Sequence, residues 1–284
     1  MYEFKNKNSL KVDIYRKIRY NLLQRHIYGL TSSFRVLPDF LVIGAKRCGT
    51  TSLYEYLGQH PCIKKSSHDN IGFFNDNFHL GIDFYKSFFP TIFEKKKIIQ
   101  KNKKFMTYDV TPFYIYHEQT PKRIHQILPN IKLIVILRNP VDRSYSNYFL
   151  GDQQKTFEEL IADEKKILNK IDKNNVDEYY DFVHTSMLAR GFYAEQLETW
   201  YKIFPKNQIL IIKSEDFAIQ TNKIMNEIFN FLGLENFNIL DNSKKNKIMY
   251  EPMKEETRKE LIEYFRPYNK KLYSMINRNF NWEK

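Results

Sequence analysis

A buried strand, a tight loop and the start of a helix follow one another in Asp39-Phe-Leu-Val-Ile-Gly44-Ala-Lys46-Arg47-Cys48-Gly49-Thr50-Thr51-Ser52-Leu53. The two glycines let the backbone approach an anion closely, and the first N–H groups of the helix point at that anion from the positive end of the helix dipole. The hydroxyls of Thr50, Thr51 and Ser52 add further donors. We therefore predict an anion-binding loop between a strand and a helix.

The two glycines have the spacing of the phosphate-binding loop G-x-x-x-x-G-K-[ST], but the basic residues are displaced. Thr50 stands where that motif has its lysine, and the bases come earlier, at Lys46 and Arg47. A nucleoside triphosphatase also needs a carboxylate to help hold Mg²⁺, and none directly ends the apolar run at residues 132–137. Both departures weigh against a P-loop-like nucleotide kinase, which stays as an alternative. A plain turn between strand and helix is another.

The rest of the chain alternates between apolar runs and helical patterns. Buried strands are predicted at residues 39–43, 105–110, 132–137 and 208–213, and helices at 51–59, 121–128, 140–150, 189–204 and 221–232. This alternation predicts an α/β fold with a central parallel sheet flanked by helices, in which ligands bind at the carboxyl ends of the strands. Residues 152–181 are expected to form a helical excursion, and 254–276 a final amphipathic helix interrupted at Pro267.

Size and charge limit the possible functions but do not identify one. With 284 residues, 42% of them hydrophobic, the chain can bury a sizeable core in one domain. The net charge of +12 favours an anionic partner, which includes nucleic acid, a membrane surface, a polyanionic sugar or a nucleotide. An even Lys and Asn bias along the chain offers a compositional explanation for the same charge. The two cysteines, Cys48 and Cys62, cannot supply a disulfide framework, so a reducing compartment is expected.

The amino-terminal stretch is basic and broken by charges every few residues. It contains neither the apolar core of a signal peptide nor a membrane span, so we expect a cytoplasmic protein. Residues 1–37 are predicted to be a basic helical extension that precedes a domain over residues 38–284. An alternative for residues 10–30 is a basic amphipathic helix that contacts an anionic membrane surface.

A second anion-binding site is predicted in the strand and helix Lys132-Leu-Ile-Val-Ile-Leu-Arg138-Asn-Pro140-Val-Asp-Arg-Ser-Tyr-Ser146-Asn-Tyr148. We call this site and the first loop the two anion grips. Pro140 suits a first helical turn, so Arg138 emerges at the carboxyl end of the strand, beside the first loop. The arginine fork matches phosphate oxygens, and Ser146 on the new helix adds a hydroxyl. Two grips on neighbouring strand–helix units indicate a ligand with separated phosphates.

Together these motifs resemble the sulfotransferase family that uses the donor PAPS (3′-phosphoadenosine 5′-phosphosulfate). The first loop is similar to the family's 5′-phosphosulfate loop, and Arg138 with Ser146 is similar to its 3′-phosphate motif. Three further similarities, over most of the chain after Pro38, are Thr111-Pro112-Phe113-Tyr114, the helix Gly191-Phe-Tyr193-Ala-Glu-Gln-Leu197-Glu-Thr-Trp200, and residues 263–272 with 280–282. The last of these resembles the branch of heparan sulfate glucosaminyl sulfotransferases. The resemblance implies a P-loop-like sulfotransferase architecture.

The resemblance also implies roles for individual residues. Arg47 would touch the transferring sulfate and neutralise charge on the leaving phosphate, with help from backbone N–H groups of the loop. The implied donor-binding residues are Lys46, Arg47, Cys48, Gly49, Thr50, Thr51, Ser52, Arg138, Ser146, Tyr193, Lys244, Lys245 and Lys247. The last three lysines would close over the 3′-phosphate, while as an isolated charge run they are solvated surface.

The acceptor side departs from the resemblance. Transfer to a hydroxyl needs a base within hydrogen-bond reach of the acceptor proton, and heparan-type relatives place a glutamate shortly before a Phe-Phe pair. Asn70 stands at that position here and cannot act as a base. The catalytic candidates beside Arg47 are therefore His68, Asp69 and Asp109, and Asp109 precedes Val110 where those relatives carry a lysine.

We therefore predict a PAPS-dependent sulfotransferase that moves a sulfuryl group to a hydroxyl or amine of a saccharide or glycoconjugate and leaves PAP (3′,5′-ADP). No metal and no nucleic acid are expected to take part, and the oligomeric state stays open. Besides the kinase, the alternatives are a homologue that binds the donor without turnover and a noncatalytic polyanion-binding module, whose binding would weaken steeply with salt.

Overall fold

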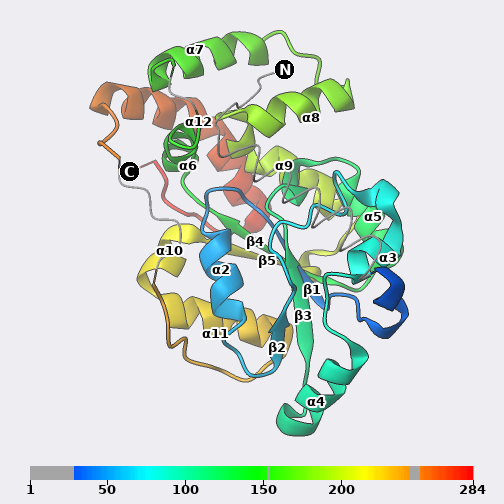
Figure 1. The fold of residues 1–284 in the computed structure, drawn as a ribbon. Helices are drawn as coiled ribbons and strands as arrows, with labels where there is room; N and C mark the ends of the chain where they lie inside the picture. The colour runs from blue at the N-terminus through cyan, green and yellow to red at the C-terminus, as the bar shows by residue number, and fades with distance from the viewer. Residues whose placement is uncertain (1–28, 152–153, 244–249, 284) are drawn as a thin grey trace.

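Five parallel strands form one sheet in the computed structural model, which describes residues 29–151, 154–243 and 250–283. In order across the sheet they are β2 (Ile63–Lys65), β3 (Met106–Val110), β1 (Phe40–Gly44), β4 (Lys132–Leu137) and β5 (Ile209–Lys213). Helices cover both faces of the sheet (Figure 1), and β1 is buried at every residue. The predicted α/β fold is confirmed.

Most predicted helices lie within a few residues of their expected places. They are α2 (Thr50–Leu57), α5 (Thr120–Ile127), α6 (Pro140–Tyr148), α9 (Tyr193–Tyr201) and α11 (Thr221–Leu232). The expected helix at 189–204 divides into a 3₁₀ turn, Ala189–Gly191, and α9. Four helical elements that the sequence did not separate are η2 (Gly29–Phe34), α3 (Gly81–Lys86), α4 (Ile92–Asn102) and α10 (Ser214–Ile219).

The predicted helical excursion is present as α7 (Phe157–Leu168) and α8 (Val176–Thr185). These two helices pack with α6 and α12 (Glu255–Ile276) around a second apolar cluster beyond the carboxyl edge of the sheet (Figure 1). Of the described residues, none forms a helix long and apolar enough to cross a membrane.

The prediction of an interruption at Pro267 is wrong, because α12 continues through that residue. A proline in a helix removes the bond to the carbonyl four residues earlier, here Glu263. Pro267 and Glu263 both lie on the exposed side of α12, where the proline ring meets no packed neighbour element among the described residues. The opposite side, with Leu261, Phe265 and Leu272, is buried and holds the helix in place.

The carboxyl edge of the sheet is the place where a ligand is expected. β1 lies between β3 and β4. The chain continues from β1 towards β2 on one side of the sheet and from β4 towards β5 on the other, so the strand order reverses beside β1. In open parallel sheets, such a reversal of strand order leaves a crevice at the carboxyl ends of the strands. The two predicted anion grips follow β1 and β4 and therefore meet there.

Candidate functional site

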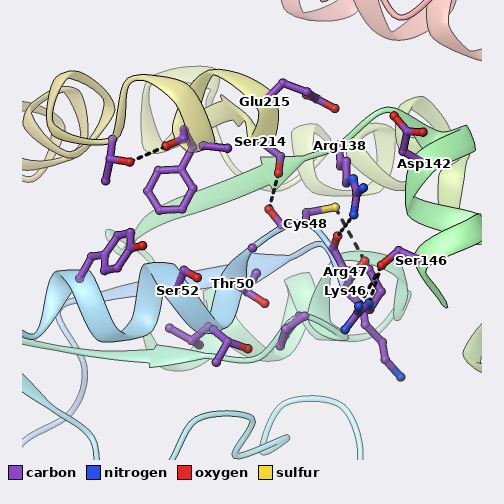
Figure 2. Close-up of a pocket in the computed structure, with 18 of the residues that line it drawn as sticks. Lys46, Arg47, Cys48, Thr50, Ser52, Arg138, Asp142, Ser146, Ser214 and Glu215 are labelled. Carbon is purple, nitrogen blue, oxygen red and sulfur yellow. Dashed lines mark hydrogen bonds between the residues drawn. The ribbon is translucent and has the colours of Figure 1, made fainter. Parts of the chain in front are cut away.

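A cavity of about 1050 Å³ lies at the carboxyl ends of β1 and β4. Its walls come from the loop after β1, the end of β4 with α6, α10 with the start of α11, and residues 69–70 and 110–113. Figure 2 shows the loop, Arg138 and Ser146 around this space. The structure therefore brings the two predicted anion grips into one site.

The loop after β1 has a backbone suited to an anion. Arg47 and Gly49 both have positive φ angles, of 70° and 101°, and a turn of this kind directs successive N–H groups to one side. Gly49 precedes α2 and caps it without a side-chain hydrogen bond. The first N–H groups of a helix lack partners within the helix itself, so an anion in the cavity would meet them.

The loop is held by one residue of β4 and by the residues that directly follow β4 and β5. Ser214, at the start of α10, donates its hydroxyl to the carbonyl of Cys48 at 2.7 Å, and the backbone N–H of Ala45 donates to Ile136 in β4 at 2.8 Å. Arg138 Nη1 reaches the carbonyl of Arg47 at 3.5 Å. These contacts fix the loop in advance of any ligand.

Cys48 and Tyr193 support the loop rather than line the cavity with their side chains. The Cys48 thiol is buried and lies 3.8 Å from the Tyr193 hydroxyl. Burial raises the pKa of this thiol to about 11, so it stays neutral. Tyr193 is buried as well and donates to the carbonyl of Arg138 at 2.9 Å. Tyr193 thus contacts Arg138 from beneath the cavity wall, and its predicted role in donor binding stays a prediction.

Arg47 and Ser146 connect the two grips directly. Nε and Nη2 of Arg47 donate to the Ser146 hydroxyl oxygen at 3.1 and 2.8 Å (Figure 2). Burial, followed by the nearby Arg138, lowers the pKa of Arg47. For Arg138 burial acts against the charge, but its interactions with Tyr250 and Asp142 raise the pKa overall. Both guanidinium groups therefore stay charged at neutral pH.

Lys46 is partly buried and lies near several other positively charged side chains. Burial lowers its pKa to about 8, with further contributions from Arg190, Arg47 and Arg143. Its ammonium lies 4.8 Å from the centre of the Phe113 ring, which is also on the cavity wall. A bound anion would relieve this repulsion, because opposite charge favours the protonated lysine.

The start of α6 is fixed by residues from two distant parts of the chain. Asn139 caps the helix by accepting from Val141 N–H at 3.0 Å, and its own N–H donates to Glu215 at 2.8 Å. Its side-chain amide donates to the carbonyl of Trp282 at 3.2 Å, and the Trp282 ring N–H donates to Glu215 at 3.3 Å. This arrangement sets the direction in which α6 presents Ser146.

The structure separates the three candidate bases. Asp69 lines the cavity beside Asn70. His68 is not among the residues that line the cavity. Its Nδ1 lies 3.0 Å from the Ser67 hydroxyl, and its ring packs edge-on against Phe88.

Asp109 is fully buried and is not on the cavity wall either. It accepts hydroxyl hydrogen bonds from Tyr114 and Thr111 at 2.8 Å each and from Tyr85 at 3.1 Å. Burial raises its pKa to about 6 even though these donors act in the opposite direction. These contacts connect Asp109 to the segment after β3 and leave it off the cavity wall, so its assignment as a catalytic base stays a prediction that this geometry does not favour.

Sequence reasoning missed the aromatic side of the cavity. Tyr56 and Phe217 both line it, with ring centres 5.6 Å apart. Tyr56 follows Ser52 by four positions, and this helical spacing places both on one face of α2. Phe217 lies in α10, which the sequence did not separate. The predicted Lys244, Lys245 and Lys247 lie outside the described residues.

Within the described ranges, no three or more His, Cys, Asp or Glu side chains gather where they could hold a metal ion. The expectation that the reaction needs no metal stays a prediction.

Comparisons with known proteins agree with the geometry. The family model of the sulfotransferase domain matches residues 37–266. The membrane-associated sulfotransferase kil1 of Dictyostelium discoideum is 30% identical over 322 residues, which cover 87% of this chain and 67% of that protein. Human bifunctional heparan sulfate N-deacetylase/N-sulfotransferase 3 is 29% identical over 294 residues, 89% of this chain and 31% of the relative. This chain thus spans about a third of the length of that second relative.

A solved structure shares the fold. The crystal structure of a sulfotransferase from Alicyclobacillus acidocaldarius superposes with a TM-score of 0.67 at 24% identity, over 88% of this chain and 100% of the other. The sheet with its flanking helices is therefore an architecture already seen in a sulfotransferase.

Proposed function

Because this chain belongs to the sulfotransferase family, we propose that it transfers the sulfuryl group of PAPS to a saccharide hydroxyl or amine and releases PAP. The observation that carries this proposal is the convergence of Arg47, Arg138 and Ser146 on one cavity. A donor with phosphate groups on both its 5′ and 3′ oxygens needs two anion grips at a fixed separation. An ordinary adenylate needs only one.

In this proposal the loop after β1 holds the 5′-phosphosulfate. The N–H groups of residues 48–51 and the charges of Lys46 and Arg47 surround the bridging oxygen, where negative charge develops as the sulfur–oxygen bond of the donor breaks. Arg138 and Ser146 hold the 3′-phosphate. Tyr56 and Phe217 provide apolar surface for the adenine.

We propose Asp69 as the base. As the acceptor oxygen or nitrogen forms its new bond to sulfur, its proton must go to a group within hydrogen-bond reach. Among the three candidates, only Asp69 lines the cavity. Asp69 stands next to Asn70, the position where the heparan-type relatives carry their glutamate.

The acceptor is proposed to be a saccharide. One relative is named as a heparan sulfate N-sulfotransferase, which supports a glycan acceptor. Another is named as membrane-associated, which supports membrane contact through the basic stretch at residues 10–30. That stretch lies almost wholly outside the described residues, and vesicle binding by a chain that lacks residues 1–28 tests its role.

The donor assignment is tested by calorimetry with PAP, 5′-AMP and Mg·ATP. We expect PAP to bind much more tightly than 5′-AMP, and Arg138→Ala to remove most of that difference. Arg266→Ala is the matched control, since Arg266 pairs with Glu263 on the exposed side of α12. Equal binding of PAP and 5′-AMP by the unaltered protein would overturn the donor assignment, and Mg²⁺-dependent preference for ATP would favour the kinase.

Turnover needs a separate measurement. Labelled PAPS is supplied with a panel of glycans that differ in free hydroxyl and amine groups. We expect label to pass to at least one of them. Tight PAP binding without transfer to any acceptor or to water would identify a donor-binding homologue without turnover.

A further inference from the structure

Helix α4 (Ile92–Asn102) is placed unlike the other long helices. None of its 11 residues is buried, and it projects beyond the amino edge of the sheet (Figure 1). A capping box closes its start, because the Thr91 hydroxyl accepts from Glu94 N–H at 3.2 Å and Glu94 accepts from Thr91 N–H at 2.9 Å. The helix is thus well formed locally but contributes no fully buried side chain to the core.

Two large aromatic side chains are exposed where α4 begins. Phe93 is 63% exposed and Phe34, at the end of η2, is 52% exposed. Their rings lie nearly parallel with centres 6.4 Å apart. A backbone bridge between Arg35 and Thr91 holds the two segments together. The pair is therefore a fixed feature of the surface, and its two rings together form a small contiguous apolar patch.

The same side of α4 is strongly basic. Lys96 and Lys97 follow Phe93 by three and four positions, so all three share one helix face, and all are exposed. Glu94, the acid that follows Phe93 in the chain, already contacts Thr91 in the capping box and Lys64 at 3.6 Å. Residues 81–104 contain seven lysines against one aspartate and one glutamate, an excess of five positive charges.

We propose that Phe34, Phe93, Lys96 and Lys97, here called the α4 surface, dock on an anionic lipid bilayer. Aromatic rings favour the boundary between head groups and acyl chains, and lysines are attracted to anionic head groups. A second copy of this chain fits less well, because two such basic faces repel each other. A soluble polyanion would need the lysines but gains nothing from exposed phenyl rings.

The chain that precedes the α4 surface supports the same partner. Residues 1–28 contain seven lysines and arginines against two acidic residues, and they join the described structure at Gly29, five positions before Phe34. The chain is thus basic on both sides of Phe34 in sequence, in residues 1–28 and in residues 81–104. Stable membrane attachment commonly needs two signals, such as an apolar insertion and a basic patch.

Docking by the α4 surface determines which way the cavity opens relative to the bilayer. Helix α4 leads into the amino end of β3, whereas the cavity lies at the carboxyl ends of the strands. These are opposite edges of the sheet because all five strands are parallel. A bilayer under α4 would therefore leave the cavity open to the solution on the other side of the protein.

The test is co-sedimentation of the full chain with vesicles of phosphatidylcholine alone and of phosphatidylcholine with phosphatidylserine. The variant combines Phe93→Ser, Lys96→Glu and Lys97→Glu. The matched control combines Ile167→Ser, Lys166→Glu and Lys170→Glu, which make the same change in net charge and lie in and just after α7, at the other end of the molecule in Figure 1. PAP binding and thermal stability are measured for each chain to verify that it is folded.

We expect the unaltered chain to bind only the anionic vesicles, and the α4 variant to bind them roughly tenfold or more weakly. The control should bind like the unaltered chain, and all three should bind PAP equally. The proposal is overturned if the unaltered chain binds no vesicles, if the α4 variant binds as well as the control, or if the variant loses binding to soluble heparin or an acidic protein instead of to lipid.

Discussion

Donor affinity should depend on the protonation of Lys46 in a calculable way. In the free protein its pKa is about 8, whereas a bound polyanion should restore it towards its ordinary value of about 10.5. The lysine is then almost fully protonated at pH 7 before binding, but only about one molecule in eleven is protonated at pH 9. The apparent affinity for PAP should therefore fall about tenfold from pH 7 to pH 9, a cost of ~1.4 kcal/mol.

Calorimetry of PAP binding at pH 7, 8 and 9 measures this effect. Proton uptake upon binding, obtained from buffers of different ionisation enthalpy, should rise from near zero at pH 7 to about 0.9 at pH 9. PAP itself contributes little in this range because its phosphates lose their last protons near pH 6. Lys46→Arg is the control, since arginine stays charged and should make the profile flat. An equal decline in the Lys46→Arg variant, or a flat profile in the unaltered protein, would refute the reasoning.

Three further predictions concern catalysis and stability. Asp69→Asn should lower kcat by about 10²–10⁴ with PAP affinity unchanged, whereas His68→Ala should keep the rate; a slow His68→Ala with a fast Asp69→Asn would reverse the assignment. Lys46→Met should raise the free energy of unfolding of the free protein by about 1–3 kcal/mol at pH 7, because folding lowers the pKa of Lys46 and so disfavours its charged form. In urea denaturation curves this gain should shrink as pH rises through 8 towards 10.5. Gly191→Ala should cost about 1–3 kcal/mol, since its Cβ would lie 2.7 Å from Phe265; Gly151→Ala, which meets only ordinary contacts, is the control, and equal melting temperatures would contradict the prediction.

Sequence patterns located four of the five strands because each is a continuous apolar run. Strand β2 was missed because it has three residues, of which only Ile63 is buried. Continuity of α12 through Pro267 was not predictable either, since it depends on which side of the helix the core covers. Local patterns thus define elements, while their ends and exceptions depend on tertiary packing.

The candidate site was predictable where backbone and charge follow directly from a motif. The loop after β1, Arg138 and Ser146 meet in one cavity because parallel strands end at the same edge. A motif does not tell which of its members face the ligand, so Tyr193 and Asp109 were included although both are buried beneath the wall. Nothing in the local sequence shows that Arg190 comes close enough to Lys46 to lower its pKa.

The contacts around Asn139 join three parts of the chain that are far apart in sequence. Trp282 and Glu215 reach the start of α6 from positions 143 and 76 residues further along the chain. A partly folded chain in which the sheet has formed but Trp282 has not docked would have the loop after β1 without a fixed direction for α6. Nucleotide binding would then be acquired late in refolding. A fluorescent PAP analogue would then report the docking of Trp282 rather than the collapse of the core.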